Sequence, residues 1–272
     1  MRKIKHIPAT ANIFCGERVI NLNKTIICTA GNTAALGFAR CALQQQGFTV
    51  TDSPAPDVTH LLLPVPSFEP DGRIKGGGIL EHILGDLPED VTVIGGNLHH
   101  PSLAGVKTVD LLQDPGYVAE NAAITADCAV RIMLKKLPIV VRECPVLVIG
   151  WGRIGKCLAK LLQAMGAAVT VAARKNADRA ILSALGYGVL DTKNLATAPK
   201  TYRVIFNTVP EPVLDAPYDT RCIKIDLASK PGLLGKDVLW ARGLPGKDAP
   251  ETSGLLIADT CSRLIFGKET LS

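Results

Sequence analysis

The sequence predicts an α/β fold divided into two domains, and three observations support this prediction. The chain has 272 residues, enough for two domains of ordinary size, and 47% of its residues are hydrophobic. Short apolar runs typical of buried strands alternate with segments of helical periodicity in both halves. One longer helical segment, residues 117–137, lies between the two halves.

The first half has the element order of a flavodoxin-like α/β domain. Residues 1–23 show no clear period, although Val19 and Ile20 are compatible with a short strand. Helices are predicted at 34–46, ended by Gly47, and at 79–84. The runs interpreted as strands, the first with its turn, are 24–31, 48–51, 60–63, 91–94 and 106–112.

Two further helices set the predicted domain boundaries. The helix at 117–137 follows Asp114-Pro115-Gly116 and stops before Pro138, which suits a helix that links two domains. Thr252 is a candidate cap for a final helix that reaches Phe266 and returns to the first domain. We therefore predict an N-terminal domain at 1–114 with about 252–272, a linking helix at 115–138 and a second domain at 139–251.

The second domain begins with a strand–helix–strand unit that carries three glycines at fixed spacing. An apolar run at 146–149 precedes Gly150, Gly152 and Gly155, which form the pattern G-x-G-x-x-G. A helical segment ended by Gly166 and a second apolar run follow. In such a unit the first glycine allows a tight turn, the second lets the main chain approach a pyrophosphate, and the third lets the helix pack on the strand.

We therefore predict a Rossmann dinucleotide-binding domain. The expected contacts at this turn are Gly150, Trp151, Gly152, Arg153, Ile154 and Gly155. The simpler alternative is a strand–helix turn that needs small residues and binds nothing.

The end of the second strand favours NADP over NAD. An NAD site usually has an acidic residue there, which accepts a hydrogen bond from the ribose 2′-OH. This chain has Arg174 and Lys175 instead, and its next carboxylate is Asp178. Two cations suit a 2′-phosphate, and the alternative is that both are ordinary solvated residues.

Three later strands are expected to end at the same edge of the sheet. The apolar runs are 201–206, 222–227 and 238–241, and each leads into a polar or Gly/Pro-rich loop. The first of these loops is expected beside the nicotinamide ring and contains Asn207, Thr208, Val209 and Pro210.

Composition narrows the class of protein. The net charge of +5 comes from scattered Lys and Arg residues, which does not indicate a nucleic-acid surface. The eight cysteines include no C-x-x-C pair and mostly lie in apolar stretches, so we expect buried reduced thiols without a metal site. The chain lacks a signal-peptide core and any apolar run of membrane-spanning length. These features favour a cytoplasmic protein.

The strand-end loops resemble, as a set, those of dipicolinate synthase A, one of the two proteins that make up that enzyme. The motifs that carry the resemblance are Gly150-Trp-Gly-Arg-Ile-Gly155, Ala173-Arg174, Asn207-Thr-Val-Pro210, Asp226-Leu-Ala-Ser-Lys-Pro-Gly232 and Gly243-Leu-Pro-Gly246 through Ala249-Pro-Glu-Thr-Ser-Gly254. The resemblance is close over residues 105–267 and rests on element order over 24–104. It implies an enzyme of sporulating bacteria that acts with a flavoprotein-like partner, dipicolinate synthase B. That enzyme oxidises a dihydro- or tetrahydrodipicolinate-type product of the lysine pathway to dipicolinate and reduces NAD(P)+.

For that chemistry the site has to hold a dicarboxylate against the nicotinamide. Lys230 and Arg242 are candidate carboxylate partners, and Asp226 is a candidate base. The hydrogen-bonding candidates are Ser229, Thr252 and Ser253, with Ser67 and Asn97 on loops of the first domain. An Asp at a strand end is also compatible with simply capping a turn, which is the alternative for Asp226, and the alternative for Lys230 is an exposed turn lysine.

Three alternatives remain open. A D-2-hydroxyacid dehydrogenase needs a histidine after the last strands of the nucleotide-binding domain, and this chain has none beyond His100. A shikimate- or alanine-dehydrogenase-like enzyme would use His99, His100 or Lys75 in the first domain. A non-catalytic NADP-binding partner protein would keep the fingerprint without hydride transfer, and a homo-oligomer is compatible with each of these functions.

Overall fold

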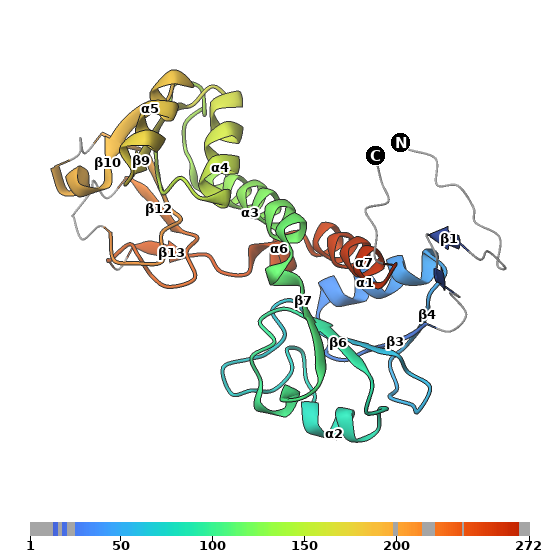
Figure 1. Ribbon diagram of the computed structural model, residues 1–272. Helices are drawn as coiled ribbons and strands as arrows, with labels where there is room; N and C mark the ends of the chain where they lie inside the picture. Colours follow the sequence, from blue (N-terminus) through green and yellow to red (C-terminus); the bar gives the residue numbers. More distant parts are fainter. Residues whose placement is uncertain are drawn as a thin grey trace. The chain divides into compact units, whose positions relative to one another are not determined.

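The computed structural model describes residues 13–15, 18–20, 25–197, 201–213, 221–235 and 237–266 (Figure 1). The chain divides into two compact units. The described residues up to Glu120 and from Ala249 onward form the first unit, and Asn121–Asp248 form the second. The predicted two-domain α/β fold is confirmed, and each unit is described by itself.

The first unit contains a five-stranded parallel sheet in the order β4-β3-β5-β6-β7. The strands are β3 (Ile26–Thr29), β4 (Thr49–Thr51), β5 (His60–Leu62), β6 (Thr92–Gly95) and β7 (Lys107–Asp110). Numbered within the sheet, this is the 2-1-3-4-5 order of flavodoxin-like folds. The short strand suggested at Val19 and Ile20 is present as β2 (Arg18–Ile20), which pairs antiparallel with β1 (Ile13–Cys15).

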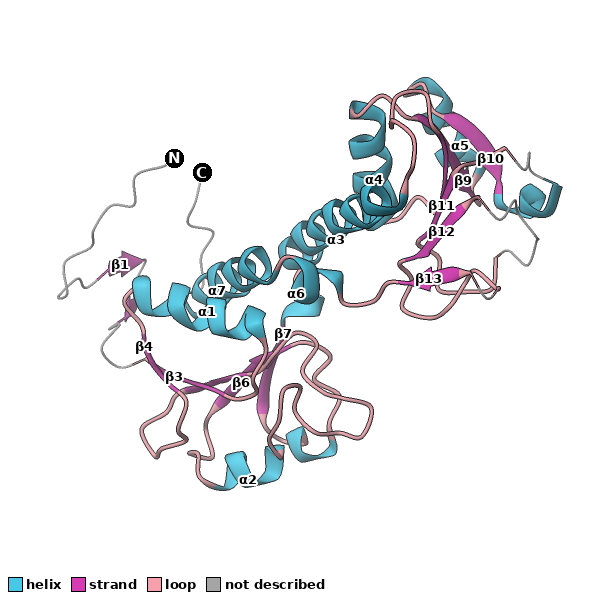
Figure 2. Ribbon diagram, turned by 180° about the vertical axis from the view of Figure 1, so that it is seen from behind, coloured by secondary structure: helices cyan, strands magenta, loops and turns pink. Residues whose placement is uncertain are grey.

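Helices cover both faces of this sheet. Figure 2 shows α1 (Ala34–Gln45) and α7 (Pro250–Phe266) side by side on one face and α2 (Leu80–Gly85) on the other. Because successive strand residues point to opposite faces, Leu62 packs under α1 and α7 whereas Leu61 packs under α2. The C-terminal helix therefore returns to the first unit, as the sequence predicted.

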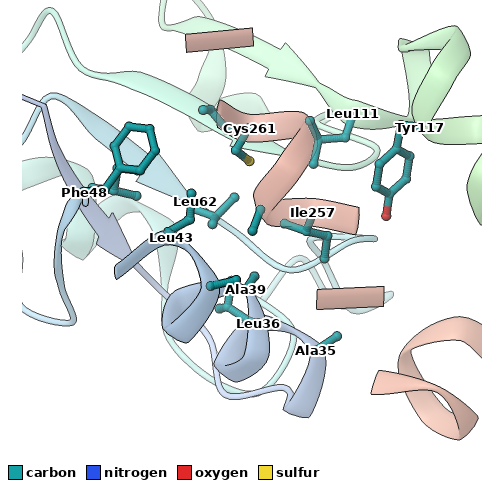
Figure 3. Packing of buried hydrophobic residues seen from close by; sticks show 14 residues of the cluster. Ala35, Leu36, Ala39, Leu43, Phe48, Leu62, Leu111, Tyr117, Ile257 and Cys261 are labelled. Carbon is teal, nitrogen blue, oxygen red and sulfur yellow. The ribbon is translucent and has the colours of Figure 1, made fainter. Parts of the chain in front are cut away.

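The contact between α1 and α7 is close because of one glycine. Leu36, Ala39 and Leu43 of α1 meet Ile257 and Cys261 of α7 in a buried cluster (Figure 3). A Cβ atom added at Gly254 would lie 2.5 Å from the carbonyl oxygen of Ala35 and 2.5 Å from Cβ of Phe38. The helices approach so closely because position 254 has no side chain.

We predict opposite effects for two glycine-to-alanine substitutions in this helix pair. Gly254→Ala should lower the free energy of unfolding of the first unit by about 1–3 kcal/mol, because backbone has to move. Gly37→Ala in α1, where nothing lies within 4 Å of the added methyl group, should raise it by about 0.5–1 kcal/mol through helix propensity. Urea unfolding followed by circular dichroism measures both. A stabilising Gly254→Ala would refute the close-packing account.

The helix α3 (Pro115–Lys136) begins in the first unit and continues into the second. Oδ1 of Asp114 accepts the backbone N–H of Tyr117 at 2.7 Å, and Pro115 fills the first helical position. The same oxygen accepts Nη2 of Arg263 in α7 at 2.7 Å. Burial raises the pKa of Asp114, but the bonds from Arg263 and Tyr117 outweigh it and hold the pKa below its usual range.

The depressed pKa of Asp114 predicts a loss of stability in acid. A carboxylate whose pKa is lower when folded stabilises the fold above its unfolded pKa of about 3.9, and this stabilisation is lost as the pH falls through the folded pKa. Asp114→Asn should therefore flatten the acid limb of the unfolding free energy of the first unit below about pH 4. Arg263→Gln should flatten it similarly. An acid limb unchanged in both variants would contradict this account.

The second unit contains a six-stranded parallel sheet in the order β10-β9-β8-β11-β12-β13. Numbered within the sheet, this is the 3-2-1-4-5-6 order of the Rossmann fold. The strands are β8 (Pro145–Ile149), β9 (Ala168–Ala173), β10 (Gly188–Asp191), β11 (Val204–Asn207), β12 (Ile223–Asp226) and β13 (Val238–Trp240). Its helical elements are α4 (Arg153–Ala164), α5 (Asn176–Ala184), η4 (Thr192–Thr197) and α6 (Leu244–Asp248), with the later part of α3.

Some predicted boundaries were wrong. The helix α7 begins at Pro250, so Thr252 lies in its first turn and is not its cap, because proline suits the first helical position. The strand expected at 106–112 stops at Asp110, whose carboxylate accepts the N–H of Leu112 at 2.9 Å and turns the chain into η3 (Leu111–Gln113). A short 3-10 turn, η2 (Pro101–Leu103), precedes this strand.

No helix within the described ranges combines the length and apolar character needed to cross a lipid bilayer. Among the cysteines whose side chains the structure describes, none forms a disulfide.

Candidate functional site

The glycine turn after β8 separates two kinds of glycine. Gly150 has φ +104°, and a Cβ atom at this position would overlap Oγ1 of Thr208. A Cβ atom at Gly155 would overlap the carbonyl oxygen of Gly150, so α4 packs directly on the end of β8. At Gly152 the backbone is extended and nothing lies within 4 Å of an added Cβ. The packing of the protein thus explains Gly150 and Gly155, but not Gly152.

The open position at Gly152 is the N-terminus of α4. Gly152 is the N-cap residue, no side chain caps the helix, and its first turn contains no acidic residue. Arg153 and Lys156 are exposed nearby, while Ile154 is half-buried. Free N–H groups and the helix dipole favour an anion at such an end. A small, open residue at this point fits a diphosphate that approaches the main chain.

Trp151, the second residue of the turn, is half-buried. Its ring packs edge-on against Tyr187 with centroids 5.9 Å apart, and Nζ of Lys156 lies 5.8 Å from its centroid. Burial raises the pKa of Tyr187. The tryptophan ring therefore packs against Tyr187 and beside Lys156 of α4.

The two cations expected at the ribose are exposed at the end of β9. Arg174 follows the last strand residue, and Lys175 is the N-cap of α5. The turn from β9 to α5 is held by Arg179, whose Nη1 donates to the carbonyl oxygens of Ala173 at 2.9 Å and of Arg174 at 2.7 Å. Sequence patterns had not indicated Arg179.

The ends of β11 and β12 are joined by a buried amide–carboxylate pair. Nδ2 of Asn207 donates to Oδ1 of Asp226 at 3.0 Å and to the carbonyl oxygen of Val209 at 2.9 Å, and its Oδ1 accepts the N–H of Val209 at 3.0 Å. Thr208 donates through Oγ1 to the carbonyl oxygen of Ile149 at 2.9 Å. Thr208 and Val209 are half-buried and Pro210 is exposed. Asn207 therefore shapes the loop from within.

Asp226 is fully buried, and its carboxylate is saturated with donors. Oδ1 also accepts the N–H of Ala228 at 3.0 Å, and Oδ2 accepts those of Gly232 at 2.7 Å and Leu233 at 2.8 Å. A side chain with four internal donors and no exposed surface cannot reach a substrate proton. The geometry therefore argues against Asp226 as a base and supports the turn-holding alternative.

The loop that Asp226 holds presents exposed polar groups. Ser229 and Lys230 are exposed. Trp240 donates through Nε1 to the carbonyl oxygen of Ala228 at 3.0 Å, and the guanidinium of Arg242 lies 5.0 Å from the centroid of the Trp240 ring. Arg242 is itself exposed, so both predicted carboxylate partners are accessible to a ligand.

The remaining predicted residues lie in the first unit. Ser67 is fully buried, and its hydroxyl is hydrogen-bonded within the protein. Its Oγ donates to the carbonyl oxygen of Pro64 at 2.9 Å and accepts the N–H of Gly96 at 3.0 Å. Ser253 is 4% exposed. Both are therefore poor substrate contacts. Asn97, with φ +55°, and Thr252 are exposed.

The first unit also has a pocket of its own, which the sequence did not indicate. It has a volume of about 320 Å³ and lies at the carboxyl ends of β3 and β4. Thr29, Asn32 and Asp52 line it together with Gly76 and Gly77. None of the predicted site residues contributes to its lining.

A parallel sheet in the order 3-2-1-4-5-6, with the glycine turn on its central strand, defines the second unit as a Rossmann-type fold of the kind found in NAD(P)-dependent oxidoreductases. No family model matches the chain. The chain is 29% identical over 171 residues to dipicolinate synthase A of Bacillus subtilis (strain 168). This match spans 58% of the present chain and 58% of the length of that relative.

Solved structures agree with this similarity. The crystal structure of dipicolinate synthase A from Bacillus halodurans superposes with a TM-score of 0.77 at 21% identity, covering 90% of this chain and 99% of that one. A transhydrogenase from Sinorhizobium meliloti has a TM-score of 0.64 at 13% identity, covering 89% and 93%. The sequence match confirms the resemblance to dipicolinate synthase A, and the two superposed structures show the fold alone.

The buried carboxylate predicts a large stability effect. Asp226→Asn would turn an amide group toward backbone N–H donors and should lower the free energy of unfolding of the second unit by roughly 2–4 kcal/mol. Lys230→Ala, an exposed change in the same loop, should alter it by less than about 0.5 kcal/mol. Both tryptophans, Trp151 and Trp240, lie in this unit, so their fluorescence reports its unfolding in urea. Equal stability of the two variants would contradict the structural role.

Proposed function

We propose that this chain is an NADP-dependent (alternatively NAD-dependent) oxidoreductase of the dipicolinate synthase type. In this proposal it oxidises a dihydro- or tetrahydrodipicolinate-type dicarboxylate to dipicolinate in the cytoplasm of a sporulating cell, together with dipicolinate synthase B. The main support for nucleotide binding is Gly152, which lies at the uncapped N-terminus of α4. The packing of the protein does not require a glycine there. The similarity to dipicolinate synthase A supports the choice of substrate class.

The second unit supplies the proposed nucleotide contacts. The first-turn N–H groups of α4 would hold the diphosphate, and exposed Arg174 and Lys175 would pair with a 2′-phosphate. The loop at Asn207–Pro210, whose shape is fixed by the buried bond to Asp226, would lie beside the nicotinamide. The bound nucleotide would supply the hydride acceptor for the oxidation.

The proposed substrate contacts follow from the charge of a dicarboxylate. Lys230 and Arg242 are exposed cations on loops that Asp226 and Trp240 hold in place, and Ser229 adds a hydroxyl donor. From the first unit, exposed Asn97 and Thr252 remain proposed contacts. Oxidation of a dihydro ring releases one hydride and one proton, and a hydroxylated tetrahydro precursor would also have to lose one water molecule. With Asp226 saturated by donors and Lys230 proposed as a cationic carboxylate partner, we assign acceptance of the proton to solvent.

A pair of glycine variants tests nucleotide binding. Gly152→Ala should unfold at the same urea concentration as the unchanged protein, yet bind NADP at least about tenfold more weakly, because the methyl group occupies the space the diphosphate needs. Gly155→Ala should lose roughly 1–3 kcal/mol of stability, because its methyl group meets the carbonyl of Gly150. Isothermal titration calorimetry measures the affinities. Unchanged NADP affinity in Gly152→Ala would refute the proposed diphosphate site.

The activity itself is tested with freshly prepared lysine-pathway intermediate. Reduction of NADP+ should be observed with the purified chain mixed with the dipicolinate synthase B of the same organism, and should be compared with the chain alone. Binding of NADP without reduction of NADP+, both by the chain alone and in the mixture with dipicolinate synthase B, would point to a non-catalytic NADP-binding protein.

A further inference from the structure

The turn after β9 is tied to the neighbouring strand by an ion pair. In the sheet, Ala173 at the end of β9 lies directly opposite Asp191 at the end of β10. Nη1 of Arg179 lies 3.0 Å from Oδ2 of Asp191, and the same nitrogen donates to the carbonyl oxygens of Ala173 and Arg174. One guanidinium therefore holds both strand ends, with side-chain exposures of 20% for Arg179 and 25% for Asp191.

The ion pair determines the net charge next to the exposed cations of the turn, Arg174 and Lys175. Asp191 is the carboxylate that sheet register puts beside the end of β9. Its Oδ1 accepts the backbone N–H of Lys193 at 3.0 Å, which adds no charge. Its Oδ2 forms the ion pair with the guanidinium of Arg179. Partly buried pairs are screened less by salt than exposed ones. Loss of the guanidinium would leave a negative charge one strand away from Arg174 and Lys175.

We propose that Arg179 and Asp191 determine the nucleotide specificity of this site. Arg179 is a positioning residue that fixes the main chain of Ala173 and Arg174 and neutralises Asp191. The turn then presents net positive charge from Arg174 and Lys175. This charge favours NADP, which carries a ribose 2′-phosphate, over NAD, which has a free 2′-OH. The inference rests on the proposed function, because it concerns the same nucleotide site.

Two roles of Arg179 can be separated experimentally. If the guanidinium only holds the two carbonyl groups, its loss weakens NADP and NAD to the same extent, because both share the turn. If it also neutralises Asp191, its loss weakens NADP selectively, because only NADP carries the additional phosphate charge. The ratio of NADP affinity to NAD affinity therefore separates the two roles, because a merely structural role of Arg179 would leave this ratio unchanged.

The experiment measures NADP and NAD affinities of the full chain by calorimetry. We expect the unchanged protein to prefer NADP, and Arg179→Met to lower NADP affinity by about tenfold or more while NAD affinity falls less than about threefold. Arg179→Lys, which keeps the charge, should restore part of the preference. The double variant Arg179→Met with Asp191→Asn should also regain part of it, because the unpaired carboxylate is gone.

Asp191→Asn alone keeps the test decisive if Arg179→Met does not fold, because it leaves the carbonyl bonds of Arg179 in place. It should raise the ratio of NADP to NAD affinity by about threefold or more, since Arg179 is then uncompensated. An unchanged ratio, equal losses for both nucleotides in Arg179→Met, or a preference of the unchanged protein for NAD would each overturn the inference. No binding of either nucleotide by the folded chain would instead refute the proposed function itself.

Discussion

The second unit depends on one steric constraint, the contact between the start of α4 and the end of β8. Gly155 brings the helix against the carbonyl of Gly150, and Gly150 in turn lies against Oγ1 of Thr208 at the end of β11. No side chain fits at either position, so the helix N-terminus points at the carboxyl edge of the two central strands. Gly152 then remains open at the point where an anion would approach.

Buried polar groups extend this arrangement along the sheet edge. Asp226 joins the ends of β11 and β12 through Asn207 and holds the following loop through three backbone N–H groups. At the other side Arg179 performs a similar task for β9 and β10. In both places a charged side chain is used internally, which leaves nearby exposed residues, Lys230 and Arg174, available for a ligand.

Local patterns were sufficient to predict much of this fold. The glycine spacing, the apolar runs and the prolines around α3 act within a few residues, so both sheets, the linking helix and the returning helix were predicted correctly. The burial of Ser67 and the donors that hold Asp226 in its turn were not identified from the sequence, because these partners come from distant segments that only the fold brings together. Arg179 was missed for the same reason, since its pairing with Asp191 depends on sheet register.

The proposed nucleotide site requires that the open N-terminus of α4 hold the diphosphate of a pyridine nucleotide. A crystal structure of the chain grown with saturating NADP tests it most directly. We expect diphosphate density within hydrogen-bonding distance of the backbone N–H groups at Gly152 and Arg153, with the 2′-phosphate at Arg174. Nucleotide density at any other place, or a helix N-terminus without density under those conditions, would contradict it.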